Sequence, residues 1–456
     1  MLAQFTVGNF LSFNKNQTLS LIAGDVQKNK ERLYQAEDMK LLKFGAIYGA
    51  NAAGKSNLFK AMSFALQVIC SGTASIHNTQ SYYRLDETNR EKPSYFEFEI
   101  CIDKKIYAYG FELHISTKEI VEEWLIELGP VRNKQIFYRN TSTGHYSYDG
   151  SLLEEQYVAR FEIYISDIRT VRNKTFLNNI MLDKDDLHRD NQKLGILKQV
   201  FDWFASLEII YPDAPAIGYD SLAIENPLIL EKAIKTFATG ISHVMFEEIS
   251  QEKVFEGTPK DIREGIEQRI QFVCTDTRIA NRGLRLNLQA RMVFVSCKDG
   301  LPHFKEVMFA HYNVKDQWFS LGEESEGTKR ILDLLAVLVT SKEHAVCVID
   351  EIDRSLHPQL TLHFVKTFLK LAKQRNIQLV ITTHESHLLN LSLLRQDEIF
   401  LVEKDCTGSS TIFPFDRFKE RFDKRIEKAY LDGRYGGVPV FETIFMPEST
   451  SLDQSL

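Results

Sequence analysis

The sequence predicts an α/β fold: a mixed β-sheet with a phosphate-binding loop after one of its central strands. An antiparallel β subdomain and a mostly helical insert are attached to this sheet. Residues 49–56 fit G-x-x-x-x-G-K-[ST] between an apolar run and an amphipathic segment. From Tyr95 onward, apolar and polar residues alternate, as in an antiparallel sheet with one solvated face. Two later apolar runs, 345–349 and 378–383, are each followed by polar residues, which is typical of buried strands that end at a site.

The bulk properties are those of a globular protein of two or three domains. The chain has 456 residues, of which 44% are hydrophobic. Its net charge of −7 argues against a protein that coats nucleic acid or anionic membrane over its whole surface, although a local basic surface remains compatible with that average. No run approaches the ~18 apolar residues of a membrane span, and no basic, then apolar, segment opens the chain. We therefore expect a cytoplasmic protein with no membrane partner.

The cysteines are scattered along the chain and form no C-x-x-C motif. They also lack any regular spacing with histidines, so neither a zinc site nor a disulfide framework is expected. Reduced thiols are the simpler interpretation. The cysteines are Cys70, Cys101, Cys274, Cys297, Cys347 and Cys406.

The first hundred residues predict a hairpin, a buried strand and a helix, in that order. Residues 5–7 and 18–22 alternate on either side of the polar stretch 14–17, which indicates a hairpin. Residues 41–48 form a continuous apolar run, as in a strand buried on both faces. After the phosphate-binding loop, apolar residues recur at helical spacing. These residues are Leu58, Ala61, Met62, Ala65, Leu66 and Ile69.

The next stretch predicts an antiparallel subdomain. Residues 96–102 alternate, a polar turn follows at 103–105, and residues 107–113 return, with a third strand near 124–128. This arrangement is unlike that of small GTPases, and no N-K-x-D motif for reading guanine is present. Adenine is therefore the expected base.

A helical insert with some strands is expected between the two lobes. Asn226-Pro227 and residues 257–261 both read as helix starts, with a capping residue or a proline in the first turn. The predicted division is an N-terminal lobe at 1–155, the insert at 156–300 and a C-terminal lobe at 301–456. A basic cluster in the insert could meet phosphates but reads mainly as a solvated helix face. It consists of Arg169, Arg172 and Lys174.

The phosphate-binding loop predicts a nucleotide site. Glycines such as Gly49 and Gly54 let backbone N–H groups, including that of Asn51, curl around a phosphate at the positive end of the following helix. Lys55 then reaches the β- and γ-phosphates, and Ser56 ligates Mg²⁺. ATP and Mg²⁺ are the expected cofactors.

Later residues complete the predicted site. Ser325 caps an apolar helix whose first turn, with Gly327, leaves N–H groups free for a second anion. Asp350 ends a buried strand and is expected to hold Mg²⁺, while the adjacent Glu351 orients and deprotonates a water. His384 ends another strand, where it is either a structural histidine or a contact to the γ-phosphate or the water.

These motifs resemble those of ABC-type ATPase heads of the RecF and SMC kind. More narrowly, the chain resembles the RloA/AbiL-like ATPases, relatives of the OLD-family ATPases of bacterial anti-phage systems. The resemblance implies an ABC-type P-loop ATPase head that hydrolyses ATP and dimerises head to tail, so that the signature residues Ser325 and Gly327 act in trans. It rests on the phosphate-binding loop, Asp350-Glu351, His384 and residues 9–13, 109–112, 324–328, 353–358 and 430–439.

The chain departs from the wider pattern at several points. Glu326 and Thr328 stand where transporters have glycine and glutamine, and the glutamine of the Q-loop is either Gln80 or Gln135. OLD-family nucleases carry a Toprim domain after the ATPase, but the stretch after His384 is too short for one. The expectation is therefore a separate effector protein, such as a Toprim or HNH-type nuclease.

The sequence is compatible with four functions, which it favours to different degrees. The preferred one is the ATPase subunit of an anti-phage defence system, in which ATP-driven head dimerisation controls the effector. The main alternative is a RecF/SMC-like clamp that binds DNA in repair, which the acidic average and the lack of a long heptad repeat disfavour. A transporter motor would need a membrane partner. A purely structural nucleotide fits poorly with two adjacent carboxylates.

Overall fold

The computed structural model describes most of the chain. The described residues are 1–152, 155–183, 195–212, 227–275, 284–288, 291–312, 317–339, 343–418 and 426–437.

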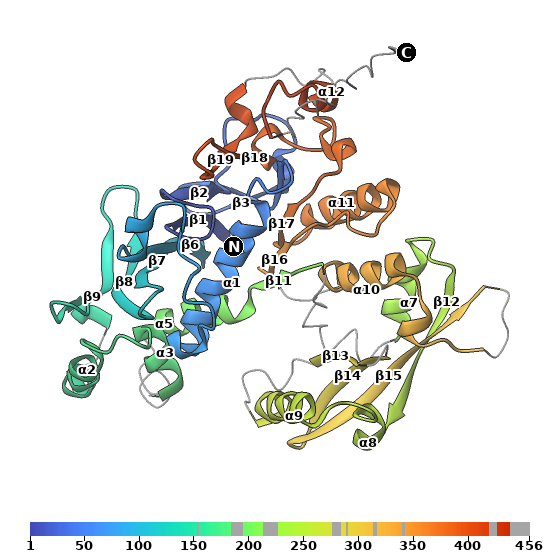
Figure 1. Cartoon of the computed structure of the whole chain (residues 1–456), viewed down its shortest axis with the longest axis horizontal. Helices are drawn as coiled ribbons and strands as arrows, with labels where there is room; N and C mark the ends of the chain where they lie inside the picture. Colours follow the sequence, from blue (N-terminus) through green and yellow to red (C-terminus); the bar gives the residue numbers. More distant parts are fainter. Residues whose placement is uncertain are drawn as a thin grey trace, which may run out of the picture.

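A six-stranded sheet lies at the centre of the molecule (Figure 1). Its order is β11-β16-β17-β5-β18-β19, and all neighbours are parallel except β18 and β19. The carboxyl ends of the parallel strands therefore meet at one edge, where ligands of such sheets bind. The strands are β5 (Phe44–Gly49), β11 (Glu208–Ile210), β16 (Val346–Ile349), β17 (Gln378–Thr382), β18 (Ile399–Lys404) and β19 (Ser410–Pro414).

Both faces of this sheet are buried, which explains its continuous apolar strands. In β16, Val346 and Val348 join one core while Cys347 and Ile349 join the other, because alternate residues face opposite sides. The first core forms around helix α1 (Lys55–Ser71), and the second includes helices α10 (Glu326–Val339) and α11 (Pro358–Ala372). The phosphate-binding loop thus connects a central strand to a helix of the first core.

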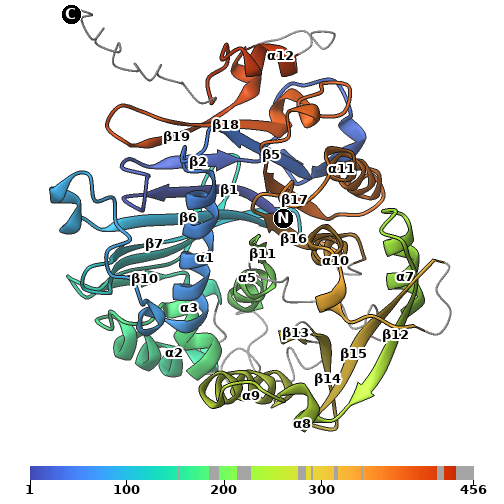
Figure 2. The same ribbon diagram turned by 45° about the vertical axis from the view of Figure 1, so that its right-hand side comes forward.

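A seven-stranded antiparallel sheet packs on the other side of α1 (Figure 2). Its order is β10-β9-β8-β7-β6-β1-β2, so the expected N-terminal hairpin and antiparallel subdomain form a single sheet. With the central mixed sheet, this is the predicted α/β architecture of a mixed sheet that carries an antiparallel β subdomain. The strands are β1 (Leu2–Gly8), β2 (Gln17–Ser20), β6 (Ser94–Ile102), β7 (Lys105–His114), β8 (Glu119–Leu128), β9 (Lys134–Asn140) and β10 (His145–Tyr148).

The insert contains helices and some strands, as expected. The helices are α2 (Glu155–Ile168), α3 (Phe176–Asn178), α5 (Gly195–Ser206), α7 (Pro227–Lys235), α8 (Gln251–Val254) and α9 (Lys260–Thr275). Helix α7 begins at the expected proline and α9 one residue after the expected Pro259; Asn226, the expected cap of α7, lies outside the described residues.

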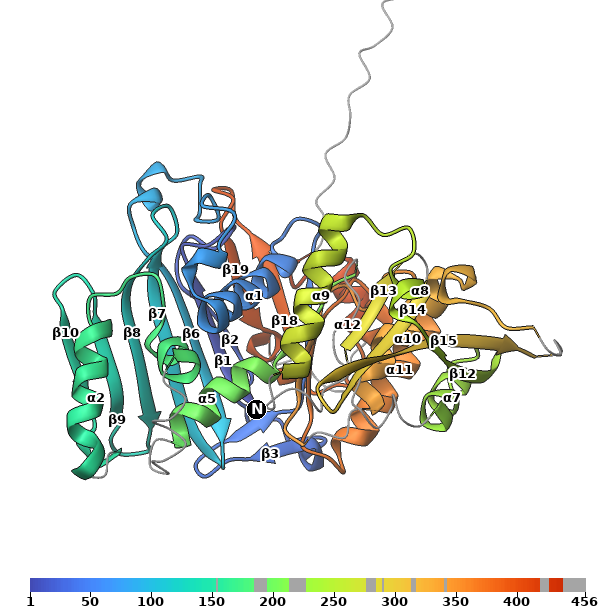
Figure 3. The same cartoon turned by 90° about the horizontal axis from the view of Figure 1, so that it is seen from below.

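A second antiparallel sheet contains strands from both the expected insert and the expected C-terminal lobe. Its strands are β12 (Ile241–Ile249), β13 (Leu284–Leu288), β14 (Arg291–Lys298) and β15 (Leu301–His311), in the order β12-β15-β14-β13 (Figure 3). Strand β15 follows the expected boundary at residue 300, yet it pairs with strands of the insert. Strand β11, also in the insert, pairs with β16 of the central sheet. The domain limits inferred from sequence therefore remain predictions.

One expected strand is in fact two. The run 41–48 is divided into β4 (Lys40–Leu42), which pairs with β3 (Leu33–Gln35), and β5. The division falls at Lys43, whose buried ammonium donates to the backbone carbonyls of Ala372 and Arg375 at 2.8 Å each. Hydrophobicity alone could not show this, because Lys43 is a buried cation that is paired only in the tertiary structure.

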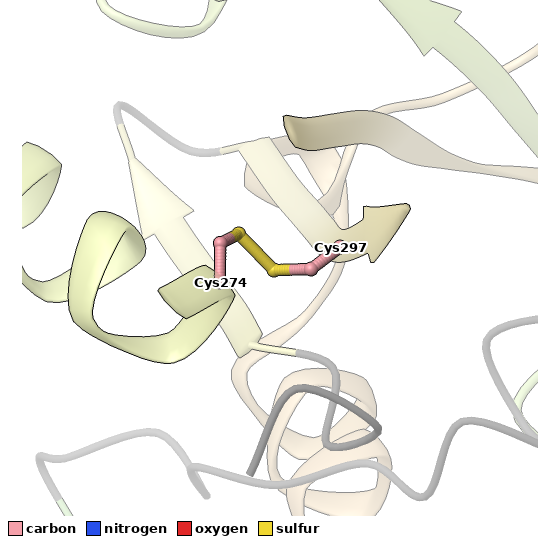
Figure 4. The surroundings of a disulfide bond; sticks show 2 residues. All are labelled: Cys274 and Cys297. Carbon is pink, nitrogen blue, oxygen red and sulfur yellow. A yellow bond between two sulfur atoms is a disulfide. The ribbon is translucent and has the colours of Figure 1, made fainter. Parts of the chain in front are cut away.

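The expectation that all cysteines are free thiols is wrong for one pair. Cys274 on α9 and Cys297 on β14 form a disulfide (Figure 4). Helix α9 packs on β14, which brings the two Cα atoms to 5.2 Å despite a separation of 23 residues. Sequence spacing does not reveal such a pairing. Cys70, Cys101, Cys347 and Cys406 are free.

None of the helices in the described part of the chain is both long and apolar enough to span a membrane.

Candidate functional site

The phosphate-binding loop lies at the carboxyl edge of the central sheet, between β5 and α1. Its two glycines are required by close packing. A Cβ on Gly49 would lie 2.6 Å from the carbonyl oxygen of Val402 on β18. Gly54 has a φ of 115° at the N-cap of α1, and its Cβ would lie 2.2 Å from Oγ of Ser410. Larger residues would displace the loop.

Two serines that sequence reasoning did not assign support this loop. Ser410 Oγ donates to the carbonyl oxygen of Ala53 at 2.6 Å and forms a hydrogen bond with Ser12 Oγ at 2.8 Å. Asn57 Nδ2 also donates to Ser12 Oγ at 2.8 Å. Ser12 and Ser410 are 398 residues apart, so no local pattern links them. The available signal was that Ser12 lies within residues 9–13, one of the segments that carry the resemblance.

Lys55 is buried and points back into its own loop. Its ammonium donates to the carbonyl oxygens of Gly49 at 2.8 Å and Ala50 at 3.1 Å. Burial lowers the Lys55 pKa to about 8, even though the nearby carboxylates, above all those of Asp350 and Glu351, oppose that shift. The lysine therefore lies close to both acidic residues predicted for the site.

Ser56 and Asp350 are directly joined. Ser56 Oγ donates to Asp350 Oδ1 at 3.1 Å, and Thr382 Oγ1 donates to the same oxygen at 2.6 Å. A hydroxyl and a carboxylate oxygen suit Mg²⁺, which takes few protein ligands and completes its shell with water and phosphate. Among the described residues, no group of three or more His, Cys, Asp or Glu side chains could hold a metal by itself. The pair thus fits Mg²⁺ bound together with a nucleotide.

Glu351 has a constrained backbone. Its φ of 47° is uncommon for a residue with a side chain. The conformation is fixed from both sides: its N–H donates to Thr382 Oγ1 at 2.7 Å, and its carbonyl oxygen accepts from Arg330 Nη2 at 3.0 Å. Its half-buried carboxylate lies 3.8 Å from Arg354. Strained residues of this kind concentrate at functional sites.

Arg330 was not predicted. It lies five residues after Ser325 on α10, and its Nη2 also donates to the carbonyl oxygen of Asp350 at 2.9 Å. The helix that begins at the signature is therefore tied to the end of β16 within one chain. An arginine on an otherwise apolar buried face was the only signal in the sequence.

His384 follows β17 and is exposed to solvent. Its N–H donates to Asp353 Oδ1 at 3.2 Å, and Thr383 Oγ1 donates to the same oxygen at 2.7 Å. Partial burial of the imidazole, followed by the charge of Lys55, lowers the His384 pKa below its usual range. These two effects favour the neutral ring. Asp353, which was not assigned a role from sequence, positions the backbone of His384.

The signature residues lie at the start of α10. Ser325 is exposed and its Oγ accepts from the N–H of Thr328 at 3.1 Å, which confirms it as the helix cap. A Cβ on Gly327 would lie 3.0 Å from the carbonyl oxygen of Ser355. The signature therefore packs against residues 353–356, and an exposed, capped helix end faces outward.

The remaining predicted residues are placed less decisively. Asn51 is exposed at the tip of the phosphate-binding loop. Gln135 on β9 bonds Ser147 on β10, at the distal edge of the seven-stranded sheet, and Gln80 accepts from Arg84 in its own loop. Neither glutamine is joined to the residues at the carboxyl edge by these contacts, so the Q-loop assignment stays open.

The state of Lys55 predicts a pH dependence. Because its pKa is about 8, the ammonium loses its proton as the pH rises through that value, and a neutral amine attracts phosphate less. The pH dependence of kcat/KM reports the ionisation of the free enzyme. We expect kcat/KM for ATP to fall above pH 8, and the decrease to become as steep as about tenfold per pH unit. Initial rates between pH 7 and 9.5 measure this, with circular dichroism as the control for folding. A flat profile would contradict it.

The chain was compared with known proteins. A family model described as "AAA domain, putative AbiEii toxin, Type IV TA system" matches residues 44–390, which include every predicted site residue. No curated protein matches the sequence.

Solved structures of SMC heads are similar over most of the chain, at low identity. The SMC head domain from Thermotoga maritima has 12% identity and a TM-score of 0.34, covering 91% of this chain and 98% of that one. An SmcHead bound to the C-winged helix domain of ScpA has 14% identity and a TM-score of 0.41, covering 92% and 99%. The Smc head domain from Pyrococcus furiosus, bound to the C-terminal domain of ScpA, has 13% identity and a TM-score of 0.40, covering 95% and 99%.

Proposed function

The chain belongs to the AAA-domain family whose model matches residues 44–390, and from this premise we propose that it binds Mg²⁺ and ATP and hydrolyses the ATP. The observation that carries the proposal is the 3.1 Å hydrogen bond from Ser56 to Asp350, because it joins the phosphate-binding loop to a carboxylate on another strand. Bound Mg²⁺ would neutralise charge on the phosphates.

Different residues of the site would bind the phosphates, hold the metal and accept the proton of the attacking water. Backbone N–H groups of residues 49–55 and the start of α1 bind phosphate, and Lys55 turns from its loop carbonyls toward the β- and γ-phosphates. Ser56 and Asp350 are the residues that would hold Mg²⁺. Glu351 takes a proton from the attacking water, with its backbone fixed by Thr382 and Arg330. The neutral His384 contacts the γ-phosphate or the water.

A direct assay tests this function. The purified chain should release phosphate from ATP in the presence of Mg²⁺, and this release should stop when EDTA is added. Because no guanine-reading motif is present, GTP should be a poorer substrate. No phosphate release and no nucleotide binding, measured in the presence of proteins from its own cell, would contradict the proposal.

We further propose that two chains share each site. Ser325 is exposed at a helix start while Arg330 ties that helix to Glu351, so a nucleotide bound to one chain could meet the signature of a second. Closed, symmetric dimers of this kind bury the same surface on both subunits.

Mixing two inactive variants tests the shared site. Lys55→Ala removes the phosphate contact and Ser325→Arg blocks the signature, so each homodimer should be inactive. After mixing in equal amounts, half of the dimers should contain both chains, and each should have one intact site. If the sites act independently, turnover should return to about a quarter of the wild-type rate. Each variant mixed with itself is the control, and no recovery would contradict sites of this composition.

The biological role we propose is control of a separate effector in bacterial anti-phage defence. It rests on the resemblance to RloA/AbiL-like ATPases, with the family match as coarser support. In this proposal the protein acts in the cytoplasm, and ATP-driven joining of two heads releases or activates an effector such as a Toprim or HNH-type nuclease.

Recovery of the tagged protein from its host, with and without phage infection, tests this role. A stoichiometric protein partner, lost from the Lys55→Ala variant, supports it. Recovery of DNA alone, with binding that weakens steeply as salt rises, would instead favour a RecF/SMC-like clamp in DNA repair.

A further inference from the structure

The last described segment of the chain packs against the start of the phosphate-binding loop. Helix α12 (Ile426–Leu431) and the turn that follows it to Gly437 form what we call the strap, residues 426–437. The helix lies close to the ends of β18 and β19 in the views of Figures 1 and 2. The strap is far from the phosphate-binding loop in sequence, and most of it lies within residues 430–439, one of the segments that carry the resemblance.

One end of the strap packs against the first glycine of the phosphate-binding loop. A Cβ on Gly437 would lie 3.4 Å from Cα of Gly49. Tyr430 packs edge-on against Tyr48, the residue before Gly49, with ring centroids 5.8 Å apart. Its hydroxyl donates to the carbonyl oxygen of Gly437 at 2.9 Å. The N–H of Gly437 donates to Glu403 Oε1 at 3.0 Å, at the end of β18. This attachment is buried and polar groups in it are paired.

The other end of the strap contacts the loop that begins with His384. Ser386 Oγ donates to Glu427 Oε1 at 3.0 Å, and His387 Nε2 lies 3.9 Å from the same oxygen. His387 and Glu427 are both exposed, with 61% and 39% of their side-chain surfaces accessible. Contacts between exposed groups are weak and easily exchanged. The strap thus has one firm attachment, at Gly49, and one weak attachment, at Ser386 and His387.

From these two attachments we propose that the strap is a positioning element which couples the phosphate-binding loop to Ser386 and His387, just after His384, and reports bound nucleotide. Tyr430 is its central positioning residue. A nucleotide that orders Gly49 on one side and the loop after His384 on the other also orders the segment that contacts both. This inference rests on the proposed function. It adds a surface segment whose order depends on bound ATP and which a partner protein can therefore recognise.

Hydrogen exchange measured by mass spectrometry tests the coupling. The Glu351→Gln chain is compared with and without Mg²⁺ and ATP, in peptides that cover residues 49–58 and 426–437. We expect exchange in both peptides to slow by about tenfold with ATP, and neither to change in Lys55→Ala. Protection of 49–58 without any change in 426–437 would overturn the inference alone. If neither peptide is protected, nucleotide binding itself fails and the inference falls with it.

Tyr430→Phe tests the positioning residue. It keeps the ring against Tyr48 but removes the hydroxyl that bonds Gly437. We expect KM for ATP to rise about fivefold, with kcat changed less than about twofold. Tyr83→Phe is the matched control, since the buried Tyr83 likewise donates to a backbone carbonyl, that of Thr407 at 2.8 Å. An equal KM in the two variants would overturn the role of Tyr430, whereas a change confined to Tyr430→Phe supports it.

Discussion

Glu351→Gln is expected to lower ATP turnover by about 10³-fold while leaving ATP bound, because loss of a general base costs about 10²- to 10⁴-fold. The substitution keeps the size of the side chain and the hydrogen bonds of its backbone to Thr382 and Arg330. The loop should therefore keep its shape, and only the proton acceptor is lost. In the proposed mechanism ATP joins two heads and turnover separates them, so the variant should accumulate as an ATP-bound dimer.

Phosphate release and size-exclusion chromatography with Mg²⁺ and ATP measure these two effects. Glu343→Gln is the matched control, since Glu343 is an exposed carboxylate that pairs with Arg375 away from the site. Its turnover should remain within about twofold of wild type, as for most surface changes. Turnover of Glu351→Gln within tenfold of wild type would mean that another group accepts the proton.

The positions of the central site residues were predictable because these residues form short sequence motifs or directly follow recognisable strands. The residues from Gly49 to Ser56 are contiguous, and their glycines are required by short contacts to Val402 and Ser410 that only a backbone without Cβ permits. Asp350 follows an apolar run that could only be a buried strand. The parallel order of the strands then brings these ends together, as observed in the bond from Ser56 to Asp350.

The supporting residues could not be predicted in the same way. Ser410 bonds Ser12 across 398 residues, and Arg330 reaches β16 from another element. Such contacts depend on how elements pack, which the spacing of apolar residues does not encode. The disulfide between Cys274 and Cys297 and the division of a strand at Lys43 were missed for the same reason.

Lys55→Ala is expected to weaken ATP binding by at least about 10²-fold, which corresponds to roughly 2.7 kcal/mol. The buried ammonium is the positive charge that the phosphates would meet, since it lies within the loop, 2.8 Å from the carbonyl oxygen of Gly49. Alanine removes that charge and leaves two loop carbonyls without their donor. No other side chain of the loop is cationic, so within the loop the remaining attraction for phosphate comes from backbone N–H groups.

Thermal unfolding separates lost binding from lost folding. A bound ligand stabilises the native state by RT ln(1 + L/Kd), where L is the free ligand concentration, so Mg²⁺ and ATP well above the Kd should raise the Tm of the wild-type chain. The same concentrations should raise the Tm of Lys55→Ala much less, even if the variant is less stable by itself. Lys60→Ala is the control, because Lys60 is an exposed lysine on α1 beyond the loop, and it should behave like wild type. An equal ATP-induced rise in Tm in all three proteins would show that Lys55 does not bind the phosphates. The Lys55 ammonium would then only stabilise its own loop, through its hydrogen bonds to the carbonyl oxygens of Gly49 and Ala50.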